Sequence, residues 1–118
     1  MIYEMKLRNS PFTKIKNGNK TIELRLYDEK RKKILVGDYI VFTNIDTLEK
    51  IKVQVTNLYL FDNFRELYSK IDNRLFGYND NNGNYKDMED YYSKEEQDKY
   101  RLLSIKIINY QQSMYQSI

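Results

Sequence analysis

The chain has 118 residues, which is enough for one domain with a modest hydrophobic core. It contains no cysteine and no histidine, so disulfides and the usual ligand sets of zinc, haem and iron–sulfur sites are excluded, and we expect no transition metal and no cofactor. The net charge is +3, with 12 Lys and Arg against 7 Asp and Glu in residues 1–59 and 8 against 10 in residues 60–118. A basic first half points to nucleic acid or another anion as a partner. The same excess of charge is also common on an ordinary soluble surface.

The amino terminus and the lack of long apolar runs bear on location. Residues 1–10 lack the apolar stretch of a secretory signal, and no run approaches the roughly 20 apolar residues that cross a bilayer. We therefore expect a cytoplasmic protein that does not enter the membrane.

The first elements in chain order are a strand and a short helix. Residues 2–7 alternate in polarity and predict an opening strand. Ser10 as the cap, Pro11 in the first helical position and Gly18 at the end predict the helix that follows. Its expected buried face consists of Phe12 and Ile15.

A second strand, residues 21–26, carries a polar row on one face. Thr21, Glu23 and Arg25 alternate with apolar residues, so their side chains share a side of the strand, and Lys20 precedes them at the junction with the helix. In a cleft, Arg25 would bind a phosphate and Glu23 would accept hydrogen bonds from the donor edge of a nucleobase. Alternatively, Glu23 would act as a general base in catalysis beside Lys20. The alternative is a solvated strand face paired with neighbouring strands.

The middle of the chain predicts further strands. Gly37 and Asp38 suit a turn in which Asp38 bonds backbone amides, followed by a strand near residues 39–42. A clear alternation over residues 48–61 predicts a half-buried strand antiparallel to its neighbour. The charged run 30–33 is either a phosphate-contacting loop or a solvated turn.

The last third predicts helices, a polar loop and a closing strand. Residues 61–71 read as a helix capped by Asp62 or Asn63, and residues 77–87 as a turn-rich loop. Ser93 and Glu96 have the spacing of a capping box at the start of a partly helical segment. The closing strand spans residues 101–108.

This order of elements predicts an α+β domain over residues 1–108, followed by a polar C-terminal tail at 109–118. Antiparallel strands with segregated helices fit a strongly curled sheet or a partly closed barrel with short helices at its ends. In the helical segment before the closing strand, Tyr91 and Tyr92 either stack on a base or pack one ring on the core and leave the other at its rim.

The stretch SPFTKIKNGNKTIELRLYDEKRKKILVGDYIVFTN, residues 10–44, resembles the signature of the ASCH domain, a small relative of the PUA-like fold. The shared pattern is a helix ending in G-x-K-T, a strand of the form I-E-x-R and a later G-D-x-I-x-F. The likeness continues more weakly through residues 61–71 and 91–107, and so covers nearly the whole chain.

This resemblance implies a barrel-like core of five or six strands with a cleft lined by residues 20–25, and RNA or a nucleotide as the ligand. Lys20 and Arg25 would then engage phosphate, Thr21 and Glu23 a base or ribose, and Tyr92 would stack. The oligomeric state is left open, and a protein-binding adaptor is a third reading.

Some members of the family are enzymes, including an N4-acetylcytidine amidohydrolase and a ribonuclease. Lys20 aligns with the catalytic lysine of the amidohydrolase, but Glu23 stands where that enzyme has its threonine nucleophile, which argues against the same deacetylation. If the chain is an enzyme, Glu23 would be its general base and Lys20 the electrostatic partner. The alternative function is therefore a small hydrolase acting on a modified nucleoside or RNA.

Overall fold

The structure is a computed structural model that describes residues 1–110, so most of the predicted polar tail, residues 111–118, lies outside the described residues. The elements within it are five strands, three α-helices and three short 3-10 helices. In chain order they are β1 (Ile2–Leu7), α1 (Asn9–Lys16), β2 (Ile22–Leu26), η1 (Arg31–Lys33), β3 (Tyr39–Asn44), β4 (Lys50–Phe61), α2 (Phe64–Lys70), η2 (Asn73–Phe76), η3 (Tyr85–Asp90), α3 (Lys94–Lys99) and β5 (Leu102–Ile108).

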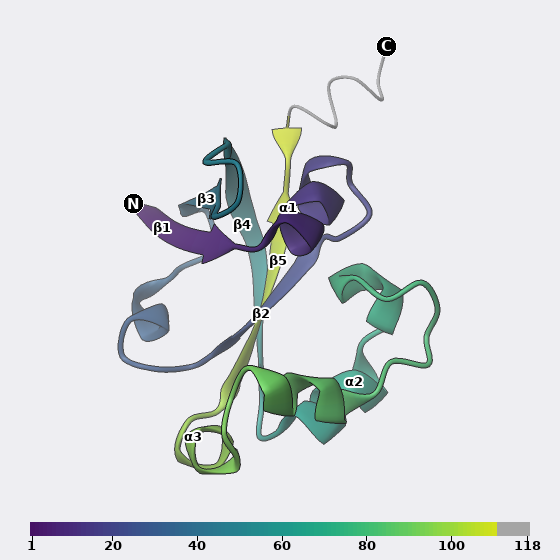
Figure 1. Ribbon diagram of the computed structural model, residues 1–118. Helices are drawn as coiled ribbons and strands as arrows, with labels where there is room; N and C mark the ends of the chain where they lie inside the picture. The colour runs from purple at the N-terminus through teal and green to yellow at the C-terminus, as the bar shows by residue number, and fades with distance from the viewer. Residues whose placement is uncertain (111–118) are drawn as a thin grey trace.

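The strands form one mixed sheet in the order β1-β3-β4-β5-β2. β1 pairs with β3 in parallel, and the other pairs are antiparallel. Figure 1 shows β4 and β5 running the length of the molecule, with α1 near one end and α2 and α3 at the other. The sheet curls into a half-barrel flanked by short helices, which confirms the predicted α+β class.

The curl brings the two edge strands of the sheet together. Arg25 Nη2, on β2, donates a hydrogen bond to the carbonyl oxygen of Lys6 on β1, at 3.1 Å. A side chain therefore joins β1 to β2 where backbone pairing would close a complete barrel. We call this gap between the two edge strands the seam.

A first apolar cluster, the barrel core, fills the half-barrel under α1. Alternation along β3 and the first half of β4 directs every second side chain into this core. Phe12 and Ile15 of α1 are both 1% exposed, as predicted. The buried members are Met5, Leu7, Phe12, Ile15, Ile34, Ile40, Phe42, Ile51, Val53, Val55, Leu103, Ile105 and Ile107.

A second apolar cluster, the outer cluster, lies on the opposite face of β2 and β5. Residues paired across antiparallel strands share a face. Glu23 pairs with Ile105 of the barrel core, whereas Leu26 pairs with Leu102 of the outer cluster. The buried members of the outer cluster are Ile22, Leu24, Leu26, Phe64, Leu67, Tyr68, Phe76 and Leu102. Because both faces of β2 are covered, its polar row is not a solvated one.

The predicted cap of α1 is wrong. The helix begins at Asn9, with Arg8 in the N-cap position and no hydrogen bond from its side chain, so Ser10 lies inside the first turn. The reason is a tertiary contact, because Asp46 in the β3–β4 loop accepts from the Asn9 amide at 3.0 Å. A cap supplied from another element leaves no local signal.

Other turn and cap predictions are confirmed. Gly18 has a φ of +86° just after α1. Asp38 accepts from the Leu35 amide, and Asn63 caps α2. Ser93 and Glu96 form the capping box of α3.

The predicted tyrosine-bearing helix is wrong in one respect. Tyr91 and Tyr92 lie in the turn between η3 and α3, because Ser93 caps the helix only after them. The turn separates the two rings, since Tyr91 is 61% exposed and Tyr92 packs against the outer cluster.

Candidate functional site

Three charged side chains meet at the seam. Glu23 Oε1 accepts from Lys20 Nζ at 3.1 Å and from the Leu24 amide at 3.1 Å, and Glu23 Oε2 accepts from Arg25 Nη2 at 3.2 Å. The side chains of Lys20, Glu23 and Arg25 are only 10%, 6% and 15% exposed. We call these three residues the seam triad, and it carries one net positive charge.

The ionisation of Glu23 follows from its surroundings. Burial acts to raise the pKa of the Glu23 carboxyl, but the charges of Lys20 and Arg25 and the hydrogen bonds from Lys20 and the Leu24 amide together outweigh it. The pKa of Glu23 is therefore lowered from its ordinary value. At neutral pH this buried group is a carboxylate that accepts hydrogen bonds and has none to donate.

Local sequence explains how Lys20 reaches Glu23. Gly18 takes a left-handed conformation after α1, and the Lys20 amide donates back to the carbonyl oxygen of Lys14 at 2.9 Å. The chain therefore reverses sharply before β2 starts. The helix-to-strand junction turns Lys20 to the side of the strand on which Glu23 lies.

The seam triad borders a cavity of about 830 Å³. One wall, the basic wall, comes from β1, α1 and β2 and consists of Lys6, Leu7, Arg8, Ser10, Pro11, Lys14, Lys20, Glu23, Leu24 and Arg25. The facing wall, the aromatic wall, comes from α2 and from the segment between α2 and α3, and it consists of Tyr68, Phe76, Gly77, Tyr78, Asp87, Met88, Asp90, Tyr91 and Tyr92. Ile45 also lines the cavity.

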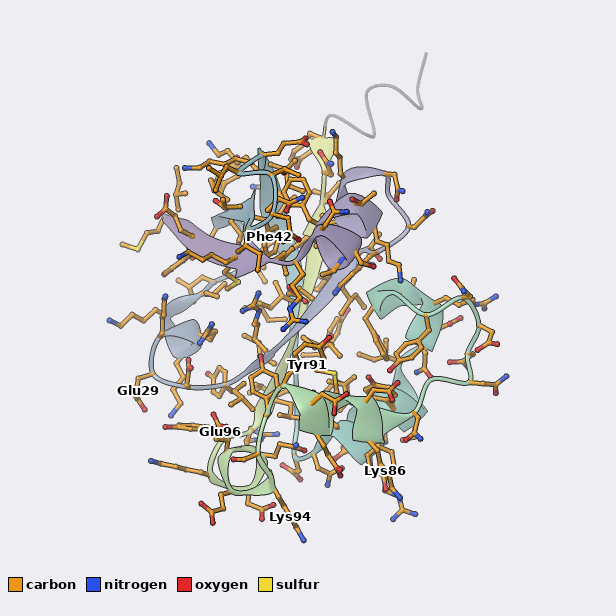
Figure 2. All side chains as sticks on the ribbon, viewed as in Figure 1. Glu29, Phe42, Lys86, Tyr91, Lys94 and Glu96 are labelled. Atoms are coloured by element: carbon orange, nitrogen blue, oxygen red, sulfur yellow. The ribbon has the colours of Figure 1, made fainter. Side chains whose placement is uncertain are left out.

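Two contacts bridge the walls. Lys14 Nζ donates to the carbonyl oxygen of Gly77 at 2.7 Å, and the Arg8 guanidinium lies 6.0 Å from the centroid of the Tyr91 ring. Figure 2 shows Tyr91 on the side of η3 that faces β2, far from Phe42 in the barrel core. An exposed ring and a cation thus lie side by side at the edge of the cavity.

The aromatic wall contains a chain of polar groups. The hydroxyls of Tyr68 and Tyr78 are 2.9 Å apart, and the Tyr78 hydroxyl donates to Asp87 Oδ2 at 2.7 Å. Burial is the first cause that raises the pKa of both tyrosine hydroxyls, and Asp87 adds to it. Both hydroxyls therefore remain protonated at neutral pH.

The structure brings together most of the predicted site residues. Lys20, Glu23, Arg25 and Tyr92 all line the cavity. Thr21 is not among the lining residues; its backbone joins neighbouring segments, with the amide donating to Leu75 and the carbonyl accepting from Ile107. None of the residues in the charged run 30–33 lines the cavity, and Arg31 and Lys32 form ion pairs with nearby acids.

Sequence reasoning missed several lining residues. Lys6, Arg8 and Lys14 were counted as part of a basic first half but not placed together, and only the curl of the sheet gathers them. Tyr68 lies in the helix predicted over residues 61–71, and Tyr78 lies in the loop predicted over residues 77–87, and neither prediction assigns these rings to a site.

Two negative findings apply to the described part of the chain. Within residues 1–110 no group of three or more His, Cys, Asp and Glu is placed to hold a metal ion. None of the helices in that range is both long enough and apolar enough to span a bilayer.

A sequence model of the ASCH domain family matches residues 5–111. A search of curated proteins found no match.

Several solved structures are similar to this chain. The crystal structure of a hypothetical protein, PH0355, is 33% identical, with a TM-score of 0.78 over 91% of this chain and 97% of that one. The solution structure of protein PF0455 from Pyrococcus furiosus is also 33% identical, with a TM-score of 0.71 over 91% and 96%. An ASCH protein from Zymomonas mobilis shares the fold at 14% identity, with a TM-score of 0.63 over 92% of this chain and 74% of that one.

Proposed function

Because the chain belongs to the ASCH domain family, we propose that it binds single-stranded RNA or a nucleotide in the cavity between the basic and aromatic walls. The observation that carries this proposal is the composition of the two walls. Cations suit phosphates, and aromatic faces suit bases of any sequence. An 830 Å³ cavity also lies in the usual size range of ligand sites, about 300–1,000 Å³.

The phosphate contacts fall to the basic wall. Its five cations, Lys6, Arg8, Lys14, Lys20 and Arg25, outnumber the three acidic residues of the whole lining. Lys20 and Arg25 are partly neutralised by Glu23, so they offer directed hydrogen bonds more than free charge. Arg8 and Lys14 supply the attraction at the edge of the cavity.

Glu23 selects the group that enters the seam. Its Oε1 already accepts two hydrogen bonds, whereas Oε2 accepts one from Arg25 and retains a free lone pair. A ligand therefore has to bring a donor, such as the amino group of a base, to Oε2. The lowered pKa of Glu23 keeps this acceptor charged.

Of the two neighbouring tyrosines, Tyr91 and Tyr92, the exposed Tyr91 is the one that can stack on a base. Tyr92 already stacks on Phe64, with ring centroids 6.0 Å apart and planes at 16°, so one of its faces is occupied. Tyr91 is 61% exposed and lies beside Arg8. A base that enters the cavity would displace or share this cation–π contact.

A salt titration with a labelled single-stranded RNA tests the proposal. We expect affinity to fall steeply with salt, and the slope of log affinity against log salt to drop by about 0.7 in Lys14→Gln, the amount for one lost phosphate contact on a single strand. Lys94→Gln is the matched control, since Figure 2 shows Lys94 on α3 pointing away from the molecule. Absence of binding at low salt would contradict the proposal.

Hydrolysis of RNA or a modified nucleoside is the less favoured function. Two cations that stabilise the ionised form of Glu23 make it a weaker base. Incubation with single-stranded RNA and with acylated cytidines, alongside a Glu23→Gln control, separates the two functions. Turnover by the native chain that the substitution abolishes would favour the hydrolase.

A further inference from the structure

We propose that the chain Tyr68–Tyr78–Asp87 on the aromatic wall is a reader of the ribose 2′-hydroxyl, which makes the cavity select RNA over DNA. This inference rests on the proposed function and names the class of strand that the same cavity takes. It is carried by the direction of the hydrogen bonds, which the partners of Tyr78 determine.

The single hydroxyl hydrogen of Tyr78 is already committed. Two oxygens lie near this hydroxyl besides that of Tyr68, namely Asp87 Oδ2 at 2.7 Å and the carbonyl oxygen of Asn84 at 3.4 Å. A carboxylate and a carbonyl can only accept. The hydrogen therefore points to Asp87, the nearer and charged acceptor.

The direction of the next bond follows. Since Tyr78 gives its hydrogen to Asp87, its oxygen has only lone pairs to offer to the Tyr68 hydroxyl 2.9 Å away. Tyr68 must then donate to Tyr78. The oxygen of Tyr68 keeps two lone pairs and no free hydrogen, so it is an acceptor.

Tyr68 is held rigidly in that role. It is 8% exposed, and its ring packs edge-to-face on Phe76 and on Tyr78, with centroids 4.9 and 5.7 Å apart. Tyr68, Tyr78 and Asp87 all line the cavity. A buried acceptor with fixed geometry rejects a ligand that lacks the matching donor, because the acceptor is then left without a partner.

The 2′-hydroxyl is the donor that fits this wall. In an internal nucleotide the 3′-oxygen is esterified, so the 2′-hydroxyl is the one donor on the sugar, and DNA lacks it. Base donors are taken by Glu23 on the basic wall, whose Oε2 has the free lone pair. We therefore assign the donor that meets Tyr68 to the sugar and not to the base.

The test compares short RNA and DNA strands of one base sequence, with uracil in both so that only the sugar differs. We expect the native protein to bind RNA about fivefold more tightly, the factor that corresponds to one neutral hydrogen bond of about 1 kcal/mol. Tyr68→Phe keeps the ring and should bring the RNA affinity down to the DNA affinity, which itself should not change.

A second variant tests the direction of the hydrogen bonds among Tyr68, Tyr78 and Asp87 rather than the presence of the Tyr68 hydroxyl. Asp87 is exposed, so Asp87→Asn is expected to fold normally. The amide it introduces can donate to Tyr78, which then donates to Tyr68 and occupies one of the two Tyr68 lone pairs. The hydrogen bond that Tyr68 accepts from a 2′-hydroxyl is then weakened, and the RNA-to-DNA ratio should fall. Loss of a negative charge should raise both affinities, so the ratio is the diagnostic quantity.

The control is Tyr59→Phe, which removes a hydroxyl from an exposed part of β4 outside the cavity and should leave the ratio unchanged. Equal binding of RNA and DNA by the native protein would overturn the inference while leaving the proposed function intact. Equal weakening of both strands by Tyr68→Phe would do the same, because the donor would then belong to the base. Binding of neither strand would overturn the proposed function and this inference with it.

Discussion

The barrel core and the outer cluster are built in different ways. The barrel core is mostly aliphatic and is enclosed by long strands and α1, whereas the outer cluster relies on aromatic rings carried by short helical segments. β2 and β5 lie between them and carry one face of each. The cavity opens where the two clusters meet, because its basic wall is anchored in the barrel core and its aromatic wall in the outer cluster.

This difference separates two tasks. Regular strands with many paired backbone groups hold the cations of the seam in fixed positions. The aromatic wall makes few contacts with the barrel, and one of them is the hydrogen bond from Lys14 to the carbonyl oxygen of Gly77. Local stability is lower where contacts are few, so we expect the aromatic wall to be the part that adjusts to a ligand.

Truncation of one phenylalanine in each cluster should have the largest effects, and the two variants should differ in RNA binding. Phe42 is 0% and Phe64 is 1% exposed, so each change to Ala should lower the free energy of unfolding by about 3–5 kcal/mol, as measured by urea denaturation. Their effects on binding should differ. Phe64→Ala removes the ring on which Tyr92 stacks and should weaken RNA binding by the folded protein.

As a control, RNA binding by the Phe42→Ala and Phe64→Ala variants is measured at low temperature and without urea, conditions in which both variants are fully folded. Phe42→Ala should then bind RNA as the native protein does, because Phe42 does not line the cavity. Equal losses of affinity in the two variants would show that the walls are not independent.

The same division explains what could be predicted from the sequence. The alternation of β4, the buried face of α1 and the strand with Glu23 and Arg25 are local periodic signals, and each appears in the structure. Most of the aromatic wall has no apolar period, because η2 and η3 are 3-10 helices of only four and six residues, and side chains fix the turns around them. Buried Asn73, for example, donates to Tyr68 and Ile71 and accepts from Gly83, contacts that no spacing rule contains. Arg25 shares a strand face with Glu23, as the alternation predicts, but the contact between Lys20 and Glu23 depends on a chain reversal at Gly18 whose geometry only the structure gives.

Neutralisation of Glu23 should have the next largest effect. Glu23→Gln leaves two poorly exposed cations without their counter-ion, and removal of one partner from a buried ion pair typically costs about 3–5 kcal/mol. The pKa of Glu23 is lowered in the folded state, so its contribution is present above the ordinary glutamate pKa, about 4.3, and is lost as the pH falls through the lowered value. Urea denaturation from pH 7 downward should show a shallower acid limb in the variant.

Asp72→Asn is the matched control for that acid limb. Asp72 also has a lowered pKa, because Arg74 donates side-chain and backbone hydrogen bonds to it, but this pair is on the surface. Its removal should change stability little at neutral pH. A larger loss from Asp72→Asn than from Glu23→Gln would contradict the assignment of the seam as the stabilising charge cluster.

Strain placed on the link between the walls should have a smaller effect. Gly77 has a φ of +117°, and an added Cβ would meet only the side chains of Lys20 and Lys14 at 3.6 and 3.8 Å, ordinary contact distances. The cost of Gly77→Ala is therefore conformational, about 1–2 kcal/mol. Because the carbonyl of Gly77 holds Lys14, hydrogen exchange should speed up in η2 and η3 more than in β3. Uniform acceleration across the chain would contradict a separately adjustable wall.

Removal of the N-terminal cap of α3 should have the smallest effect. This helix follows the aromatic wall in the chain but does not line the cavity. Ser93 and Glu96 satisfy each other's backbone amides, and no residue of α3 is buried. Ser93→Ala should therefore cost about 1 kcal/mol in thermal or urea unfolding and leave the RNA-to-DNA ratio unchanged. Since Ser93 directly follows Tyr92, an unchanged ratio would show that the hydroxyl chain of the aromatic wall acts independently of the helix beside it. A change in the RNA-to-DNA ratio would show that α3 also contributes to ligand recognition, so that the aromatic wall includes this helix.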